Sequence, residues 1–335
     1  MKKLLIFLLL LAIGSVSFAD DALVLPKGVL RTYVVPAFVF TTGEYDDTGE
    51  YTAYESEDGA IQVFNLGAAV EYGVIDWISA AVQWAPGYTI WSDIDLPAPG
   101  DLQKINGAFG IFAGAKVQLV GEKALINSDM FRFALAPGAK IPMPMPDWKK
   151  QGENAAALEN YIYPEAYMLL TKPAFAAGAR VYFDFIVHKM FYINLYGEFM
   201  KYFDRTMDLL EFAQATGYPG SKYEIETMFN YTYLAEIEPH FEMMLGEGLQ
   251  LKIGAPVRYS FSPEYDAIEK TDLFGDTTMT VDKSYSLTVG PNVSLFFRTF
   301  VIPLEIKVGY TLPLMGESTF AQHTVSMQVK AYMKF

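Results

Sequence analysis

The sequence predicts an all-β protein, built as a single closed antiparallel transmembrane β-barrel of about twelve strands. Three observations predict this fold. The chain ends in a segment with one apolar face, its connections alternate between long and short, and its apolar residues are spread along the chain in strand-length pieces. These are the features of chains that cross a membrane with strands.

The last twelve residues, 324–335, alternate between apolar and polar side chains. Side chains of a strand point to opposite faces with period two, so this segment has one apolar and one polar face. Together with the final aromatic residue, it is similar to the closing strand of a bacterial outer-membrane barrel, although an edge strand of a soluble sandwich would alternate in the same way. We interpret part of its apolar face as an insertion signal for the barrel-assembly machinery: Val329, Ala331, Met333 and Phe335.

The first nineteen residues predict a signal peptide. Lys2 and Lys3 precede an apolar run from Leu4 to Ile13, and the small residues of Ser17-Phe18-Ala19 form a cleavage site. We therefore expect cleavage after Ala19 and a barrel domain that spans residues 20–335. The sequence contains no cysteine, which excludes disulfides and thiolate chemistry.

The composition of the remaining chain excludes one class of partner. Without residues 1–19, which hold two lysines, 316 residues remain with 23 basic and 39 acidic side chains, a net charge of −16. Binding to nucleic acid needs a basic surface, so no nucleic-acid partner is expected. The 22 Tyr and 25 Phe residues fit the aromatic girdles of a membrane barrel.

Clusters of Gly, Asp, Glu and Pro separate the expected strands. We place them at residues 29–40, 61–72, 77–91, 106–119, 130–143, 172–186, 191–203, 231–244, 249–262, 284–297, 303–313 and 322–335. Long connections (41–60, 92–105, 144–165, 204–226 and 263–283, with a shorter one at 314–320) alternate with short ones (73–76, 120–129, 187–190, 245–248 and 298–302). This rhythm is typical of a barrel whose long loops face the cell exterior, and an even strand number places both termini on the periplasmic side.

The segment 144–171 leaves the strand number open. Residues 155–158 favour a short helix, whereas residues 161–170 fit either a further strand or an extension. Barrels of ten or fourteen strands therefore remain alternatives.

The two faces of the expected strands differ in polarity. In the segment 249–262, Leu251, Ile253 and Val257 lie on one face, and Lys252 and Arg258 on the other. An apolar face toward lipid and a polar face inside is the reverse of a soluble barrel, and such a sheet must close because lipid cannot pair its edges.

Charged residues on the inward faces are the candidate lumen lining: Lys116, Arg132, Lys140, Arg180, Glu236, Glu238, His240, Glu242, Lys252, Arg258, Glu305, Lys307 and Lys330. Opposite charges on neighbouring strands pair readily, so these residues form either a structural lattice or a lattice that also lines a solute path.

Nothing in the sequence indicates an enzyme. The three histidines, His188, His240 and His323, have no nucleophile and orienting acid at a recognisable spacing. The acidic segment 41–60 lacks the spacing of a calcium loop, so no metal and no cofactor are expected.

Two segments, Glu71–Trp77 and Phe133–Pro142, resemble parts of outer-membrane transporter barrels. The group that they resemble is the long-chain fatty-acid and aromatic-hydrocarbon transporter family, which implies a barrel that passes hydrophobic solutes around an N-terminal hatch. Only residues 20–27 precede the first expected strand, so we expect a barrel without a hatch of that kind.

These interpretations predict a channel or passive transporter for small solutes, embedded in the lipid of a bacterial outer membrane. The alternative is a closed structural barrel, or a surface adhesin that acts through its acidic loops. The identity of the solute, an open or plugged lumen, and assembly into homo-oligomers stay open at this point.

Overall fold

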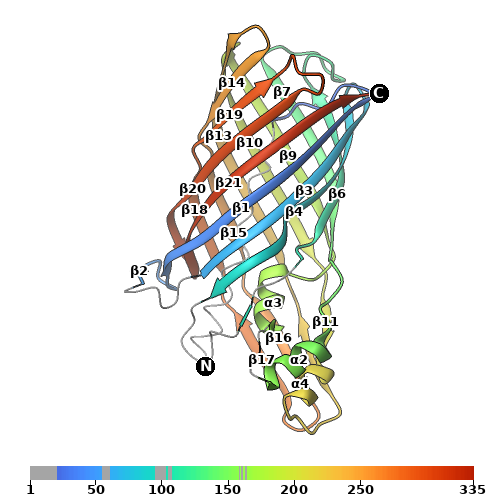
Figure 1. Cartoon of the computed structure of the whole chain (residues 1–335), viewed down its shortest axis with the longest axis vertical. Coiled ribbons are helices and arrows are strands. Elements are labelled where there is room, and N and C mark those ends of the chain that lie inside the picture. The colour runs from blue at the N-terminus through green and yellow to red at the C-terminus, as the bar shows by residue number, and fades with distance from the viewer. Residues whose placement is uncertain are drawn as a thin grey trace.

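The structure, a computed structural model, describes residues 21–54, 61–94, 103–104, 108–157, 159, 161–162 and 164–335. Within these residues the main sheet closes into an antiparallel barrel of twelve strands (Figure 1). The predicted fold class and strand number are confirmed, and barrels of ten or fourteen strands are excluded.

Each position in the barrel wall is filled by one strand or by two collinear strands. In order around the ring these are β1 (Val29–Tyr45), β3 (Ile61–Ile75), β4 (Ile78–Ile94), β6 (Ile111–Val120), β7 (Phe131–Ile141), β9 (Ala176–His188), β10 (Phe191–Tyr202), β13 (Tyr231–Gly246), β14 (Leu249–Gly254) with β15 (Val257–Ser262), β18 (Ser284–Val289) with β19 (Asn292–Phe297), β20 (Leu304–Glu317) and β21 (Thr319–Lys334). Pairing of β1 with β21, from Val29 opposite Lys334 to Tyr45 opposite Thr319, closes the ring.

The barrel has two unlike ends. At the terminal end, where β1 begins and β21 finishes, the strands are joined by short turns (Figure 1, top). At the loop end (Figure 1, bottom), most of the connections are long and carry their own structure. The predicted long-and-short rhythm is therefore confirmed, except at 314–320, where a tight turn at Ser318 joins two strands that run almost to it.

The long connections contain elements of their own, most of which the sequence analysis did not predict. β11 (Arg205–Asp208), β12 (Tyr223–Thr227), β16 (Tyr265–Thr271) and β17 (Gly275–Val281) form a second sheet beyond the barrel wall. It is accompanied by α2 (Trp148–Ala156), α4 (Leu210–Ala215) and the short strands β2 (Tyr51–Ala53), β5 (Gln103–Lys104) and β8 (Tyr161–Ile162).

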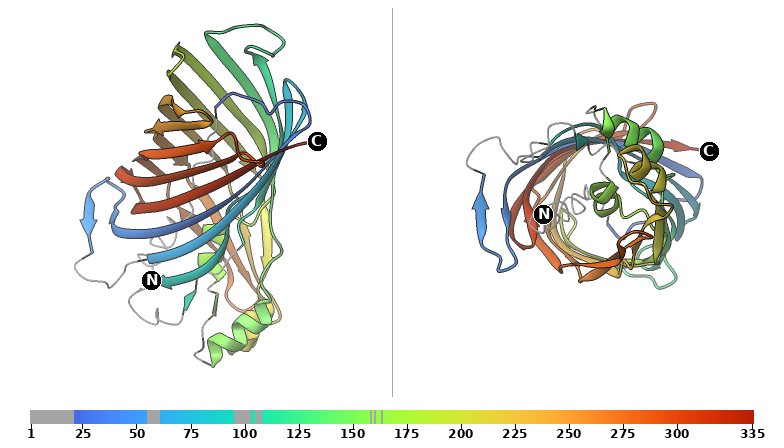
Figure 2. Two further views of the ribbon diagram at one scale, coloured as in Figure 1. Left: turned by 45° about the horizontal axis from the view of Figure 1, so that its top comes forward. Right: turned by 90° about the horizontal axis from the view of Figure 1, so that it is seen from below.

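The segment left open by the sequence adds no barrel strand. Residues 164–171 form the helix α3 (Pro164–Thr171), so the interpretation of 161–170 as a strand is wrong beyond the two residues of β8. The end-on view in Figure 2 shows α3 (green) inside the ring of strands. The short helix expected near 155 is the end of α2.

Two expected strands, 249–262 and 284–297, are each interrupted once, at 255–256 and at 290–291. Pro256 and Pro291 lack the N–H that a central strand donates to its ladder, which explains the breaks. The wall stays connected there, because the Gly290 N–H donates to the Pro256 carbonyl (2.8 Å) and the Tyr310 N–H to the Pro291 carbonyl (3.1 Å).

Among the helices of the described residues, none has the length and apolar character needed to cross a membrane.

The barrel lumen as the candidate functional site

The barrel wall is apolar outside and polar inside. On β21, Thr324 and Lys330 point inward and are 7% and 5% exposed, whereas Val325 and Met327 point outward and are 44% and 41% exposed. Other strands repeat the pattern, with Val34, Val70 and Ile253 exposed on the outside. A soluble barrel would show the reverse arrangement, so the outer face is suited to lipid.

The predicted lining residues lie on the inner face of the wall, and several of them pair. Lys140 Nζ is 2.8 Å from Glu198 Oε1, and Arg180 Nε is 2.7 Å from Glu198 Oε2. Arg180 also donates to Gln83 Oε1 (2.5 Å) and lies over the Phe112 ring. This group joins five neighbouring strands, β4, β6, β7, β9 and β10, across the inner wall.

A second group lies around the two proline breaks. Arg258 donates to Glu236 Oε2 from both Nε (2.7 Å) and an Nη atom (2.6 Å). Glu238 lies 2.8 Å from His240 Nε2 and accepts from Asn292 Nδ2 (2.9 Å). The predicted cluster of Glu236, Glu238 and His240 with Arg258 therefore exists, with Arg258 and Glu236 as an ion pair and His240 beside Glu238.

A third group centres on Glu305. Its carboxylate accepts from Ser294 Oγ and Tyr332 OH, both at 2.8 Å, and lies 3.8 Å from Lys252 Nζ and 4.0 Å from Lys330 Nζ. Glu242 extends this group, since it lies 3.8 Å from Lys252 and accepts from Gln250 (2.7 Å) and Tyr192 (3.2 Å). Whether these charges line a solute path stays a prediction.

Three inner-wall carboxylates were missed by the sequence analysis: Glu71, Asp184 and Glu198. Glu71 pairs with Arg31 and accepts from Ser79 Oγ (2.5 Å). Asp184 accepts from Asn194 Nδ2 (2.8 Å) and lies 3.5 Å from the predicted residue Arg132. The signal was available, because Asp184 alternates with Tyr182 and Arg180 in the predicted strand 172–186.

The residues that precede β1 lie inside the barrel at the terminal end. The Ala22 N–H donates to both oxygens of the Asp184 carboxylate (3.2 and 3.1 Å). Lys116 Nζ donates to the carbonyls of Asp21 (2.8 Å) and Leu23 (3.1 Å), and Ala22 is fully buried. We call residues 21–25 the N-terminal segment. Its place in the lumen was not foreseen.

The loop end of the lumen is filled by apolar side chains. Tyr167 and Met168 of α3 are buried in a cluster with Ile61 and Val63 of the barrel wall and with Trp148 of α2. The Tyr167 and Trp148 rings meet edge to face at 5.5 Å between centroids. The expectation of a polar interior is therefore wrong for this end, because inward side chains there pack against α3.

Lys172 lies directly beneath this apolar cluster, between α3 and β9. Its backbone adopts φ 41°, and its ammonium donates to Ser262 Oγ (3.2 Å) and lies over the Tyr202 ring. Burial, together with repulsion from Lys140, lowers the pKa of Lys172 to about 7. A lysine in this environment changes its charge near neutral pH.

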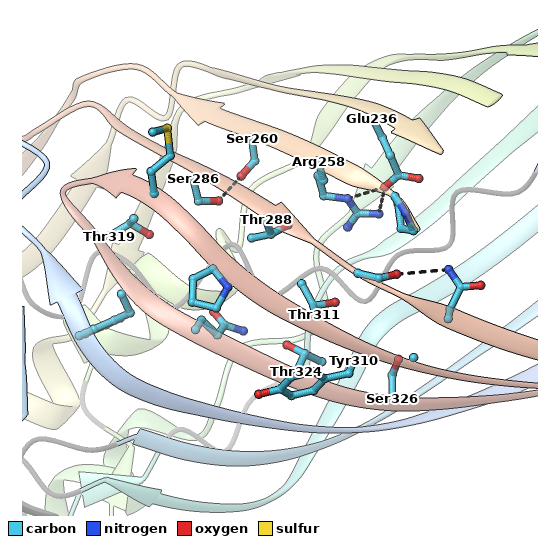
Figure 3. Close-up of a pocket in the computed structure, with 18 of the residues that line it drawn as sticks. Glu236, Arg258, Ser260, Ser286, Thr288, Tyr310, Thr311, Thr319, Thr324 and Ser326 are labelled. Atoms are coloured by element: carbon cyan, nitrogen blue, oxygen red, sulfur yellow. Dashed lines mark hydrogen bonds and ion pairs between the residues drawn. The ribbon is translucent and has the colours of Figure 1, made fainter. Parts of the chain in front are cut away.

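A cavity opens on the side of the lumen formed by β15, β18, β20 and β21 (Figure 3). Its volume is about 80 Å³, counted over the positions available to the centre of a water molecule. Hydroxyl side chains dominate its polar lining, and we call it the hydroxyl cavity: Ser260, Ser286, Thr288, Thr311, Thr324 and Ser326. None of these residues was in the predicted lining set, which considered charged groups.

The predicted insertion signal lies on the last strand. Val329, Ala331 and Met333 share the outward face of β21 with Val325 and Met327, and Phe335 follows the strand and is largely exposed. Their role in assembly stays a prediction. Within the described part of the chain, no three His, Asp or Glu side chains gather as metal ligands.

No family model and no curated protein matches the sequence. Among solved structures, the COG4313 outer membrane channel from Pseudomonas putida F1 superposes with a TM-score of 0.60 at 12% identity, over 95% of this chain and 100% of that chain. A TodX deltaS2S3 mutant, a monoaromatic hydrocarbon channel, has a TM-score of 0.46 at 8% identity, over 93% and 91%. A Pseudomonas aeruginosa FadL homologue has a TM-score of 0.35 at 8% identity, over 92% and 90%.

The first of these similarities shows a shared fold. Together with the apolar outer wall and the ionised inner wall, it defines the class of this protein: a closed transmembrane β-barrel with the architecture of an outer-membrane channel.

Proposed function

We propose that the protein is a channel or passive transporter that admits small solutes across the outer membrane of a diderm bacterium. The observation that carries this proposal is the reversal of polarity across the wall, with exposed Val325 and Met327 outside and buried Glu236, Glu305 and Lys330 inside. Charged groups are costly to bury, and they are retained here around the axis along which a solute would pass.

In this proposal the terminal end faces the periplasm and the loop end faces the cell exterior. In the described conformation α3 packs inside the loop end, and the N-terminal segment is hydrogen-bonded to the wall at the terminal end. A solute would pass when these segments move aside, and the barrel wall with its paired charges would stay in place. No cofactor or energy source is needed for such diffusion.

A second candidate, a closed barrel that serves as a surface anchor or adhesin, is favoured by the apolar packing of the loop end. The hairpin of β16 and β17 also presents Leu273 and Phe274 at its tip, and Phe274 is 80% exposed. Exposed apolar side chains of this kind are a feature of interaction surfaces.

Single-channel recording in a planar bilayer separates the two candidates. The channel proposal expects discrete conductance steps from folded, purified barrels. Persistent silence, both from the wild type and from a variant that lacks residues 21–25, would support the closed anchor. Folding of each sample is checked by the heat-dependent gel mobility of barrels.

A further inference from the structure

We propose that the hydroxyl cavity binds small uncharged polyols, molecules of about the size of glycerol, on their way through the lumen. The inference deepens the proposed channel function by naming a solute class. It rests on hydrogen bonding, charge and size, each observed in the described part of the chain.

The cavity offers hydrogen-bonding groups that the protein itself leaves unused. Ser260 and Ser286 bond to each other at 2.7 Å (Figure 3). In contrast, within the described residues the hydroxyls of Thr288, Thr311 and Ser326 bond to no other protein group, although they line the same cavity. A hydroxyl donates one hydrogen bond and accepts two. Neighbouring groups that both donate and accept match the vicinal hydroxyls of a polyol.

Two of the three charged side chains on the cavity wall are paired with each other, Arg258 with Glu236. The third, Lys307, forms no ion pair in the described part of the chain. A cationic solute would give up hydration here and gain no unpaired counter-charge in return. An uncharged polar solute does not incur this cost.

The cavity wall also carries apolar side chains, among them Pro256, Pro313 and Met315, which suit the carbon backbone of a polyol. A hydrocarbon would contact these side chains as well, but it would displace water from the hydroxyls and leave them without partners, which weakens binding several-fold for each group.

The volume sets the size of the ligand. One water molecule needs about 10 to 15 Å³ of such volume, so 80 Å³ corresponds to roughly five to eight waters. Glycerol, with six non-hydrogen atoms, replaces about that number. The cavity opens into the lumen, which allows a longer polyol such as ribitol to extend along it.

The test is direct binding, measured by saturation-transfer difference NMR on the barrel in lipid nanodiscs with glycerol and ribitol as probes. We expect saturable signals from both polyols. In the variant Thr288→Val/Thr311→Val/Ser326→Ala, which keeps the volume nearly constant, each lost hydrogen bond weakens binding by about fivefold, or about a hundredfold in total. Thr32→Val, a change on the outward face of β1, is the matched control and leaves binding unchanged.

A second variant tests the location. A Cβ at Gly309 would lie 3.4 Å from Asn292 Cβ, 3.6 Å from Ser326 Oγ and 3.7 Å from the Pro291 carbonyl oxygen, so the Cβ of Gly309→Val is accommodated on the cavity wall. The variant should abolish polyol binding. Equal binding by wild type, the triple variant and Gly309→Val would overturn the proposal, as would saturable binding of toluene that displaces the polyols.

Transport is measured separately, by osmotic swelling of liposomes that contain the barrel. If ions pass and polyols neither bind nor pass, the polyol inference fails and the channel survives. Polyol binding without any conductance would support the cavity and contradict the channel.

Discussion

The backbone N–H of Ala22 lies between the two carboxylate oxygens of Asp184, 162 residues away in the sequence, at 3.2 and 3.1 Å. This contact ties the chain ahead of β1 to the far wall of the barrel. Lys116 holds the same segment from β6 through two carbonyls. The N-terminal segment is thus held inside the terminal end of the lumen by hydrogen bonds to charged groups, which are among the stronger ones in proteins.

Loss of either anchor should release the N-terminal segment. Asp184→Asn and Lys116→Met each remove charge-assisted hydrogen bonds worth roughly 1.5 to 3 kcal/mol apiece. We expect a higher open probability in single-channel recordings for both variants. The two variants change the lumen charge in opposite directions, so their ion selectivities should differ while their open probabilities rise together. A rise in only one of them would show that charge, and not the segment, controls opening.

Closure of the loop end should depend on pH through Lys172. Its pKa is lowered to about 7, so between pH 7 and its ordinary value near 10.5 the unfolded chain binds a proton that the closed structure does not. Stability of the closed arrangement therefore rises with pH across this window and is weakest below pH 7. Below pH 7 the ammonium is charged beside Lys140, with Glu198 already paired to Lys140 and Arg180.

Conductance should accordingly increase as the pH falls from about 10 to 7 and level off below pH 7. Lys172→Met removes the titrating group and should give a conductance that is flat between pH 7 and pH 10. A wild-type response that persists in this variant would place the sensor elsewhere in the barrel.

Ion selectivity should respond to charge reversal inside the barrel. Lys252 lies near two carboxylates, Glu242 and Glu305. Lys252→Glu removes the positive charge that they share and adds a third negative charge beside them. The reversal potential in a salt gradient should shift toward cation preference, and Arg258→Glu should shift it in the same direction. Lys201→Glu makes the same charge change on the outward face of β10 and serves as the control. An unchanged reversal potential for Lys252→Glu would remove it from the solute path.

The hairpin of β16 and β17 should stay ordered in acid. Asp272 accepts from the Ser221 N–H (2.7 Å), the Ser221 hydroxyl (2.6 Å) and the Tyr218 hydroxyl (2.8 Å), and these bonds hold the pKa of its carboxyl well below the usual value. This stabilisation is fully present at pH values above the usual pKa of an aspartate. It is lost only when the pH falls to the much lower pKa of Asp272. Proteolysis near 217–222 should therefore be slow at both pH 7 and pH 4, and fast at both in Asp272→Ala.

Much of the barrel was predictable because one rule governs every wall strand. Side-chain alternation located twelve strands within a few residues of their observed bounds, and it placed Lys252 and Arg258 inside. The breaks at Pro256 and Pro291 were not predicted, because alternation continues across both prolines; neither can donate a ladder hydrogen bond.

The sequence analysis missed the features that do not follow from the side-chain alternation of strands. Residues 161–170 are apolar at both helical and strand spacings, and the lumen that buries Tyr167 and Met168 exists only once the barrel has closed. Lys172 was placed at the start of the expected strand 172–186, whereas the structure begins β9 at Ala176. The sequence places Thr288 on an inward face and Ser326 on the polar face of the last strand. The cavity that they share, however, depends on the register of four strands.

The most direct test of the central claim, apolar side chains toward lipid and polar side chains toward a watery lumen, uses the absence of native cysteine. Ser326→Cys and Met327→Cys are neighbours on β21 that should face opposite sides of the wall. Labelling of each variant in intact membranes with a charged methanethiosulfonate should modify the cysteine at 326 and spare the one at 327, which should react with a lipid-soluble maleimide. The opposite pattern of labelling would contradict the account.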